Sequence, residues 1–426
     1  MTKPATKVIT LGCRLNAYES DVIAGHARDM ELRGAVVINS CAVTGEAVRQ
    51  SRQAVRRARK DNPDAQIIVT GCAAQIDPKA FASMPEVDRV IGNSEKMLAG
   101  TFDPKQLAAS EPILVNDIMS VRETAPQLIM GGNRERGKTQ DRTRAFLQVQ
   151  NGCDHRCTFC IIPYGRGNAR SVAAGEVVAH VKDLAAQGYG EVVLTGVDLS
   201  SWGGDLPGAP PLGDLVRRVL KLVPELPRLR LSSIDPAEVD DALFDALCHE
   251  PRMTPYLHLS LQAGDDMILK RMKRRHLRAD VTELCARLKA ARPEITFGAD
   301  MIAGFPTETD AMFETGKSII AEIGLPWLHV FPYSAREGTP AANMPAVNGA
   351  VIKARARALR QEAARVKAAH MRARLDDVDE ALFEADGMGR LADFTRVKVD
   401  NPPKAGQFAK VKLTAKTDEH MIGVLA

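Results

Sequence analysis

The chain has 426 residues, of which 45% are hydrophobic and 26% charged, and its formal net charge is +4. These values are typical of a globular protein rather than a disordered chain, and the length predicts two or three domains. The charge permits a polyanionic partner without requiring one.

Two features of the sequence bear on where the protein works. No apolar run approaches the ~18 residues of a membrane helix, so we expect no membrane partner. The start, "MTKPATKVITLGC", lacks the apolar core of a secretory signal. We therefore expect a cytoplasmic protein, in which clustered cysteines more often bind metal or do chemistry than form disulfides.

The first part of the chain repeats one pattern three times. "KVITLGC", "AVVINSC" and "QIIVTGC" each consist of an apolar, β-branched run, a small residue and a cysteine, and helix-like stretches such as 46–60 separate them. This alternation predicts an α/β domain over 1–118, with a doubly wound parallel sheet. Cys13, Cys41 and Cys72 then fall just past the carboxyl ends of their strands, at the edge where open α/β sheets bind ligands.

Residues 119–143 show no periodicity and are predicted to form a linker. Strand and helix patterns then alternate over 144–370, with the strand candidates "AFLQVQ", "EVVLTG", "RLRLSS", "YLHLSLQ", "ITFGADMI" and "WLHVFPY". They predict a partial β/α barrel with its chemistry at the carboxyl ends of the strands. A basic helix over 351–375 leads into the tail, 371–426, whose short β-type runs predict a small antiparallel β-barrel.

Three cysteines stand close together in "GCDHRCTFCIIP": Cys153, Cys157 and Cys160, here called the loop triad. On a loop, this spacing brings three thiolates within reach of one centre. A four-iron cluster held by three cysteines keeps one iron open for an exchangeable ligand. The alternatives are a zinc site, with His155 as an awkwardly placed fourth ligand, or buried thiols without a metal.

The remaining cysteines are of two kinds. A lone cysteine after a strand is more often a small buried apolar residue than a ligand. Cys13, Cys41 and Cys72, here called the sheet triad, occupy equivalent positions on adjacent strands and should converge on one edge. Their pattern alone leaves both a second cluster and three core thiols open. Cys248 and Cys285 lie in amphipathic helical stretches and are predicted core residues.

These motifs carry a family resemblance. The loop triad resembles the cysteine signature of the radical S-adenosylmethionine (SAM) superfamily. "TLGCRLNAYES", "INSCAVT" and "VTGCAAQ" resemble the amino-terminal domain of the methylthiotransferases, and the tail resembles the RNA-binding TRAM domain. All three match in order, so the resemblance covers nearly the whole chain.

Within that family, "TLGCRLNAYES" with "RAFLQVQNGC" and "CTFCIIPYGRG" is most similar to the threonylcarbamoyladenosine tRNA methylthiotransferases. The isopentenyladenosine tRNA enzymes, nearer "YGCQMN" in the first motif, and the ribosomal-protein aspartate enzymes, nearer "LGCPKN", are the sibling alternatives. A metal-stabilised RNA-binding protein without enzymatic activity is a third. The incomplete triads disfavour it, because structural zinc sites are closed by four ligands.

The resemblance implies a transferase that replaces an aromatic C–H of a modified adenosine beside the anticodon with a methylthio group. It implies two [4Fe–4S] clusters: one at the loop triad, which binds SAM, and one at the sheet triad, which presents sulfur. The implied partners are the tRNA anticodon arm and an electron donor of the flavodoxin or ferredoxin type.

Contacts to SAM are implied around the loop triad and at the carboxyl ends of the barrel strands. Phe159 is expected to pack on the adenine, and the other residues to meet the amino, carboxylate or ribose groups. Each strand-end residue has an alternative role in capping or turns. The expected contacts are Phe159, Gly196, Val197, Asp198, Ser233, Gln262, Asp300 and Arg336.

Two basic surfaces are candidates for RNA. In the stretch 46–60, four arginines stand three or four residues apart and so share one helix face: Arg49, Arg52, Arg56 and Arg59. Residues 388–417 hold seven Lys or Arg and two acidic residues, a net charge of +5. Both surfaces suit phosphates, although a charged face is often only solvated. The expected RNA contacts are Arg49, Arg52, Arg56, Arg396, Lys398, Lys410 and Lys412.

Overall fold

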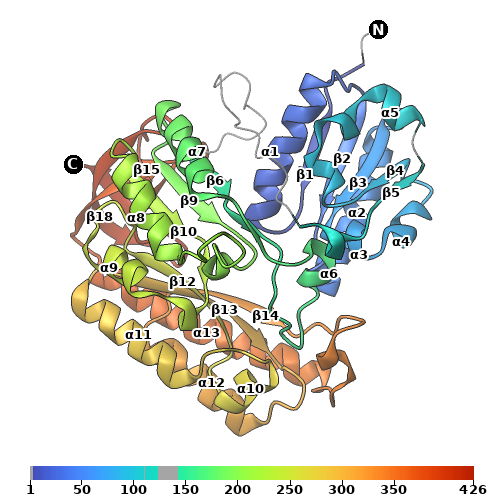
Figure 1. Ribbon diagram of the computed structural model, residues 1–426. Coiled ribbons are helices and arrows are strands. Elements are labelled where there is room, and N and C mark those ends of the chain that lie inside the picture. Colours follow the sequence, from blue (N-terminus) through green and yellow to red (C-terminus); the bar gives the residue numbers. More distant parts are fainter. Residues whose placement is uncertain (1–2, 110, 123–142) are drawn as a thin grey trace. The chain divides into compact units, whose positions relative to one another are not determined.

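The computed structural model describes residues 3–109, 111–122 and 143–426, which fall into two compact units (Figure 1). Unit 1 comprises Met1–Gln140, Gln150–Val172 and Ser334–Thr339. Unit 2 comprises Asp141–Val149, Ala173–Tyr333 and Pro340–Ala426. The predicted linker falls largely on 123–142, outside the described residues. Every helix in the described part of the chain falls short of the length or apolarity that a membrane span requires.

Unit 1 is built on a parallel sheet of five strands in sequential order. The register places Thr10 beside Asn39 and Ser40 beside Gly71, so the carboxyl ends of the first three strands meet at one edge. The strands are β1 (Lys7–Thr10), β2 (Ala35–Ser40), β3 (Gln66–Gly71), β4 (Arg89–Ile91) and β5 (Ile113–Leu114). A separate antiparallel pair consists of β7 (Gln150–Asn151) and β8 (Arg170–Ser171).

Helices cover both faces of this sheet, which confirms the predicted doubly wound arrangement. Ile23 of α1 packs in a core with Val37, whereas Val55 of α2 packs with Val36 on the opposite face. Thr44 caps α2 by accepting a hydrogen bond from an amide of its first turn. The helices are α1 (Arg14–Asp29), α2 (Gly45–Asp61), α3 (Cys72–Ile76), α4 (Pro78–Ala82), α5 (Pro104–Ala109) and α6 (Ile162–Arg166).

Unit 2 contains the predicted partial β/α barrel. Its parallel strands form two sheets, in the orders β10-β9-β6 and β11-β12-β13-β14. Ser232 alone separates β10 from β11, so the two are one interrupted strand, and all six strand candidates are confirmed. The strands are β6 (Arg144–Gln148), β9 (Glu191–Thr195), β10 (Arg228–Leu231), β11 (Ser233–Ile234), β12 (Tyr256–Gln262), β13 (Thr296–Ala303) and β14 (Trp327–Pro332).

Helices cover the outer face of the barrel strands. The Lys289 Nζ of α11 lies 5.9 Å from the centre of the Phe297 ring on β13. Leu257 of β12 is paired with Phe297 in the sheet. The alternate residues, including His258 and Asp300, face the other side, which is the interior of the barrel. The helices are α7 (Ala174–Ala186), α8 (Leu212–Leu222), α9 (Asp241–His249), α10 (Asp266–Arg271), α11 (Arg278–Ala291), α12 (Asp310–Glu322) and α13 (Gly349–Ala373).

The tail forms a closed five-stranded barrel in the order β15-β16-β17-β19-β18, as predicted. Its pairs are antiparallel except for β17 with β19. Arg228 and Arg230 of β10 donate hydrogen bonds to the carbonyls of Glu380 and Ala392 in the tail, at 2.7 and 2.9 Å. The two barrels of unit 2 are therefore packed together. The tail strands are β15 (Val378–Phe383), β16 (Met388–Leu391), β17 (Arg396–Val399), β18 (Phe408–Lys416) and β19 (Met421–Leu425).

Candidate cluster and cofactor sites

The sheet triad lies at the carboxyl edge of the sheet in unit 1. Cys13 follows β1 as the N-cap of α1, Cys41 follows β2, and Cys72 follows β3 as the first residue of α3. Gly12 and Gly71 precede two of these cysteines with φ of +95° and +94°, a backbone conformation that glycine adopts without strain. The strand ends and glycine turns bring the three cysteines to one edge.

The three thiols of the sheet triad are close enough to influence one another. A Cβ atom built on Gly12 would lie 2.8 Å from the Cys41 Sγ, so only glycine fits beside that thiol. Burial, and to a smaller extent the neighbouring thiols of Cys72 and Cys13, raise the pKa of Cys41 to about 11. Thiolates at such a site need a compensating positive charge, which a bound metal centre supplies. The donor set therefore fits an iron–sulfur cluster.

A buried ionic network lies beside the sheet triad. The Glu19 carboxylate, which is 0% exposed, accepts hydrogen bonds from Lys96 at 2.7 Å and from Arg166 at 2.8 Å. Burial raises the pKa of Glu19, but the two cations outweigh it and lower that pKa to about 2. Two cations and one carboxylate leave a net charge of +1 next to Cys13 and Cys72, whose electrostatic influence reaches Arg166.

This network also joins the loop triad to the sheet. Arg166 ends α6, just after the loop triad, and also donates a hydrogen bond, at 2.6 Å, to Asn16 of α1. Asn93 donates to the Gly165 carbonyl and lies with its Nδ2 3.8 Å from the Cys72 Sγ. Both triads consequently belong to one compact unit.

The network is the part of the site that the sequence analysis missed. The structure buries Arg166 against Glu19, an internal carboxylate. Glu19 and Lys96 lie in helical segments, away from the strand ends where ligands are expected. No signal in a single sequence pairs positions so far apart along the chain.

The backbone of the loop triad is fixed by local hydrogen bonds. The Cys153 amide donates to the Gly167 carbonyl at 3.1 Å, and the Cys160 amide donates to the Cys157 carbonyl at 3.0 Å. Gly152, at φ +71°, passes so close to the backbone of Asn168 that a Cβ would clash there. Cys157 is buried, whereas Cys153 and Cys160 are partly exposed, which suits a cluster with one open iron.

The other two cysteines are core residues, as predicted. Cys248 of α9 is buried, and Cys285 of α11 is 2% exposed. Burial raises the pKa of Cys285 to about 12, so this thiol is neutral and unreactive. None of the eight cysteines, all of which the structure describes, forms a disulfide bond.

The predicted SAM contacts of unit 2 lie at or near the strand ends. They are partly exposed, although the strands that carry them are mostly buried. Gln262 ends β12 with φ +67°, a strained conformation for a residue other than glycine and one that is frequent at binding sites. Asp198 accepts a hydrogen bond from the Ser201 hydroxyl at 2.7 Å, so its carboxylate also stabilises the local turn, which was its alternative role. These residues are Gly196, Val197, Asp198, Ser233, Gln262 and Asp300.

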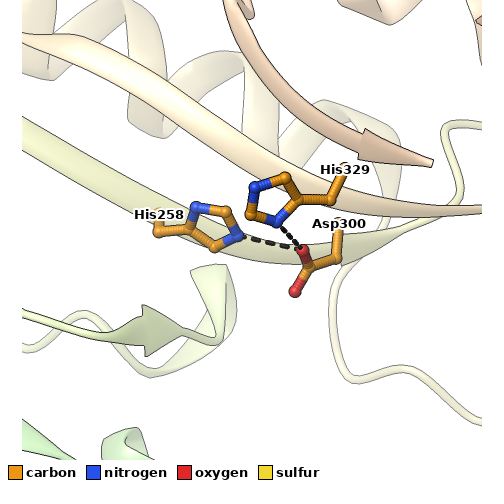
Figure 2. Close-up of side chains that lie close together, drawn as sticks. All are labelled: His258, Asp300 and His329. Atoms are coloured by element: carbon orange, nitrogen blue, oxygen red, sulfur yellow. Dashed lines mark hydrogen bonds and ion pairs between the residues drawn. The ribbon is translucent and has the colours of Figure 1, made fainter. Parts of the chain in front are cut away.

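Asp300 lies between two histidines of neighbouring strands (Figure 2). One carboxylate oxygen accepts hydrogen bonds from His258 Nε2 at 3.1 Å and from His329 Nδ1 at 3.0 Å. Burial raises the pKa of Asp300, but these two hydrogen bonds outweigh it and hold the pKa well below its usual range. Asp300 is therefore an anionic acceptor. As such it suits a hydroxyl or ammonium group of SAM and not the carboxylate.

Phe159 and Arg336, the other predicted SAM contacts, belong to unit 1. Phe159 is half-buried within the loop triad segment. Arg336 lies near Cys41. Burial lowers the pKa of the Arg336 guanidinium, and the electrostatic effect of Cys41 raises it to a smaller extent. The structure thus places Arg336 beside the sheet triad.

The predicted RNA contacts on α2 differ in their availability. Arg49 is bonded to Glu46 of the same helix, at 2.7 Å from Nε. Arg52 lies over the ring of Phe81 at 5.9 Å. Arg56 is exposed and has no hydrogen-bond or ion-pair partner in the described part of the chain.

In the tail barrel, basic residues alternate with core residues, as predicted. Lys398, Lys410 and Lys412 point outward, and Arg396 is bonded to Asp386. The strand β19 lies between β17 and β18, and its exposed Ile422 and Val424 stand beside Lys398 and Lys412. The outward faces of β17 and β18 therefore coincide in one surface, which the sequence left open.

Two family models match the chain. The Radical SAM superfamily matches residues 147–315, which include the loop triad and most of the β/α barrel. The uncharacterized protein family UPF0004 matches residues 5–92, which include the sheet triad.

Full-length relatives decide the family. The threonylcarbamoyladenosine tRNA methylthiotransferase MtaB of Rickettsia prowazekii (strain Madrid E) is 50% identical over 98% of this chain and 97% of its own length. The chain belongs to the threonylcarbamoyladenosine tRNA methylthiotransferases. The tRNA-2-methylthio-N(6)-dimethylallyladenosine synthase of Maricaulis maris (strain MCS10) is 32% identical over 100% of this chain and 98% of its own length. The lower identity disfavours that sibling alternative.

This threonylcarbamoyladenosine tRNA methylthiotransferase is therefore a radical SAM enzyme that uses a [4Fe–4S] cluster and SAM. This finding favours an iron–sulfur cluster over the zinc and metal-free alternatives for the loop triad. Among solved structures, the radical SAM methyltransferase TsrM of Kitasatospora setae is 16% identical, with a TM-score of 0.58, over 80% of this chain and 75% of that one. At that identity the likeness shows the fold alone.

Proposed function

We propose that the six triad thiols of this threonylcarbamoyladenosine tRNA methylthiotransferase hold two [4Fe–4S] clusters. Membership of the radical SAM superfamily, whose match includes residues 153–160, supports the cluster at the loop triad. A second cluster at the sheet triad rests on one observation: three thiols at one sheet edge, beside a network of net charge +1. An iron–sulfur cluster with three thiolate ligands is anionic, and Lys96 and Arg166 would offset that charge.

The substrate determines which part of the reaction the cofactor performs and which part the protein performs. The C–H bond of an adenine ring is not acidic, so SAM, cleaved by one electron, supplies the radical that reacts with it. Each thiol of the loop triad would bind one iron, so the fourth iron would remain open to the amino and carboxylate groups of SAM. The partly exposed residues of unit 2 predicted to contact SAM remain our candidates for that role, with Asp300 as a hydrogen-bond acceptor. The sheet triad would present the sulfur.

The same proposal includes the partners. The outward face of the tail barrel, with Lys398, Lys410 and Lys412, and the α2 face with Arg56 would contact the phosphates of the anticodon arm. Reductive cleavage of SAM needs a one-electron donor, which we assign to a flavodoxin or ferredoxin type. The expected compartment is the cytoplasm.

Triple Cys→Ala variants of the two triads test the two-cluster proposal. Removing the loop triad should leave roughly half of the iron, because one three-cysteine site remains, and should abolish cleavage of SAM. Removing the sheet triad should leave cleavage of SAM to 5′-deoxyadenosine under reducing conditions but stop sulfur insertion into tRNA. Iron and sulfide are measured in anaerobically purified protein, and the product by nucleoside mass spectrometry.

The matched control is Cys285→Ala, which removes a buried thiol outside both triads. It should retain the iron content of the wild type. Unchanged iron in either triple variant would contradict the two-cluster proposal, and methylthiolated tRNA from the sheet-triad variant would reduce that triad to a structural role.

A further inference from the structure

A strip of basic side chains runs along one face of α13 in unit 2. Lys353, Arg357 and Arg360 are exposed and stand four and three residues apart, so their side chains share one face of the helix. We call these three residues the α13 strip. They line a hollow of about 410 Å³ together with Pro332, Ala356, Gln361 and Ala364. No acidic side chain is among these lining residues.

Other arginines of α13 are neutralised within the fold. Arg355 is bonded to Glu308 at 2.8 Å and to Asp310 at 2.6 Å. Arg365 is bonded to Glu362, one turn earlier on the helix, at 2.6 Å. These ion pairs offset the charges of Arg355 and Arg365, whereas the cations of the α13 strip have no acidic partner in the described part of the chain.

The cations of the α13 strip have most of their hydrogen-bonding capacity unused. Lys353 and Arg357 have no hydrogen-bond or ion-pair partner in the described part of the chain. Arg360 donates one hydrogen bond, to the Val330 carbonyl at 3.0 Å. A guanidinium carries five N–H donors and an ammonium three, so the strip can bind several further acceptors.

The α13 strip lies near the carboxyl end of β14, one of the barrel strands. The hydrogen bond from Arg360 to Val330 and the contact with Pro332 put it at the carboxyl end of β14, the edge strand of its sheet. Phe331, between these two residues, is 37% exposed. Barrels of this type do their chemistry at the carboxyl ends of their strands. A polyanion that delivers a base to the barrel would pass close to this rim.

We propose that the α13 strip binds backbone phosphates of the tRNA arm that presents the modified adenosine. This inference rests on the proposed function and adds to it a surface that none of the predicted RNA contacts includes. The strip spans about 10 Å of helix, at 1.5 Å per residue. That length is enough for the strip to contact more than one backbone phosphate. Charge complementarity selects a polyanion, and phosphates are the acceptors that unpaired Arg and Lys side chains bind.

The test is the double variant Arg357→Gln and Arg360→Gln in the full chain. Its matched control, Arg365→Gln and Arg372→Gln, removes the same charge from another exposed face of α13. The probe is an anticodon stem-loop RNA that carries threonylcarbamoyladenosine, titrated between 50 and 200 mM salt. We expect the strip variant to bind at least about tenfold more weakly and to reduce the salt slope by about 1.4, or 0.7 for each lost phosphate contact.

The control variant should keep the affinity of the wild type within about threefold, because its face is not in contact with the RNA. Replacing Arg357 and Arg360 by Lys, which keeps the charge, should restore most of the affinity. Equal affinity and salt slope for the strip variant and the control would overturn the proposal, as would weaker binding with an unchanged salt slope. Wild-type protein that binds this RNA but fails to methylthiolate it would instead contradict the proposed function.

Discussion

The buried Glu19 carboxylate offers the sharpest test of how unit 1 is held together. In Glu19→Gln the side chain keeps its shape but loses the charge that pairs with Lys96 and Arg166. The two cations then remain in a site that is closed to water. Breaking a buried ion pair by removing one partner destabilises a protein far more than the loss of an exposed pair.

The size of the effect follows from the pKa of Glu19, which is lowered from its ordinary value of 4.5 to about 2. A shift of one pKa unit corresponds to 1.36 kcal/mol, so the charged form contributes about 3 kcal/mol at pH 7. For a unit of this size, each kcal/mol changes the midpoint of thermal unfolding by about 2–4 °C, and we expect a decrease of about 6–12 °C.

The assay is thermal unfolding of the purified proteins, followed by circular dichroism, at pH 7 and at several lower pH values. Because the pKa of Glu19 is lowered, its contribution is present above pH 4.5 and is lost as the pH falls toward 2. Wild type and Glu19→Gln should therefore converge in stability below pH 4.5. The control is Glu46→Gln, which breaks an exposed pair with Arg49 and should change the midpoint little. A loss below about 1 kcal/mol at pH 7 would refute the reasoning.

Two further outcomes are expected. Gly71→Ala places a Cβ against the backbone of Ser40 at a φ of +94°, so it should displace Cys72 and lower the iron content to that of the sheet-triad Cys→Ala variant, with cleavage of SAM retained. The double variant Lys398→Gln and Lys412→Gln should weaken tRNA binding and reduce its salt slope, because both side chains lie on the outward face of the tail barrel.

Much of the architecture follows from local sequence patterns. A β-branched run that ends in a small residue and a cysteine predicts the same position, just past the end of a strand, for Cys13, Cys41 and Cys72. Parallel strands in register bring these equivalent positions to one edge. The alternation of Lys with Val and Leu at 410–413 likewise predicts which side chains point out of the tail barrel, and β18 confirms it. In both cases neighbours in the chain are sufficient to specify the arrangement.

The ionic network could not be predicted, because its members are distant in the chain. Lys96 lies 77 positions from Glu19, and Arg166 lies 147 positions from it. Each residue looks like an ordinary polar position of a helix until the tertiary fold buries all three together. Local pattern also says little about which surface cations stay available. Arg49 and Arg56 share a predicted face, but Glu46 binds only the first of them.

The union of the two barrels in unit 2 restricts how such enzymes can be recombined. Arg228 and Arg230 at the start of β10 donate to tail carbonyls, so a chain shortened before β15 would lose these hydrogen bonds and leave Arg230 with Glu191 as its partner. A chimera that takes its barrel from one parent and its tail from another must match these contacts. The outward-facing side chains of β17, β18 and β19 are therefore easier to exchange between relatives than the whole tail.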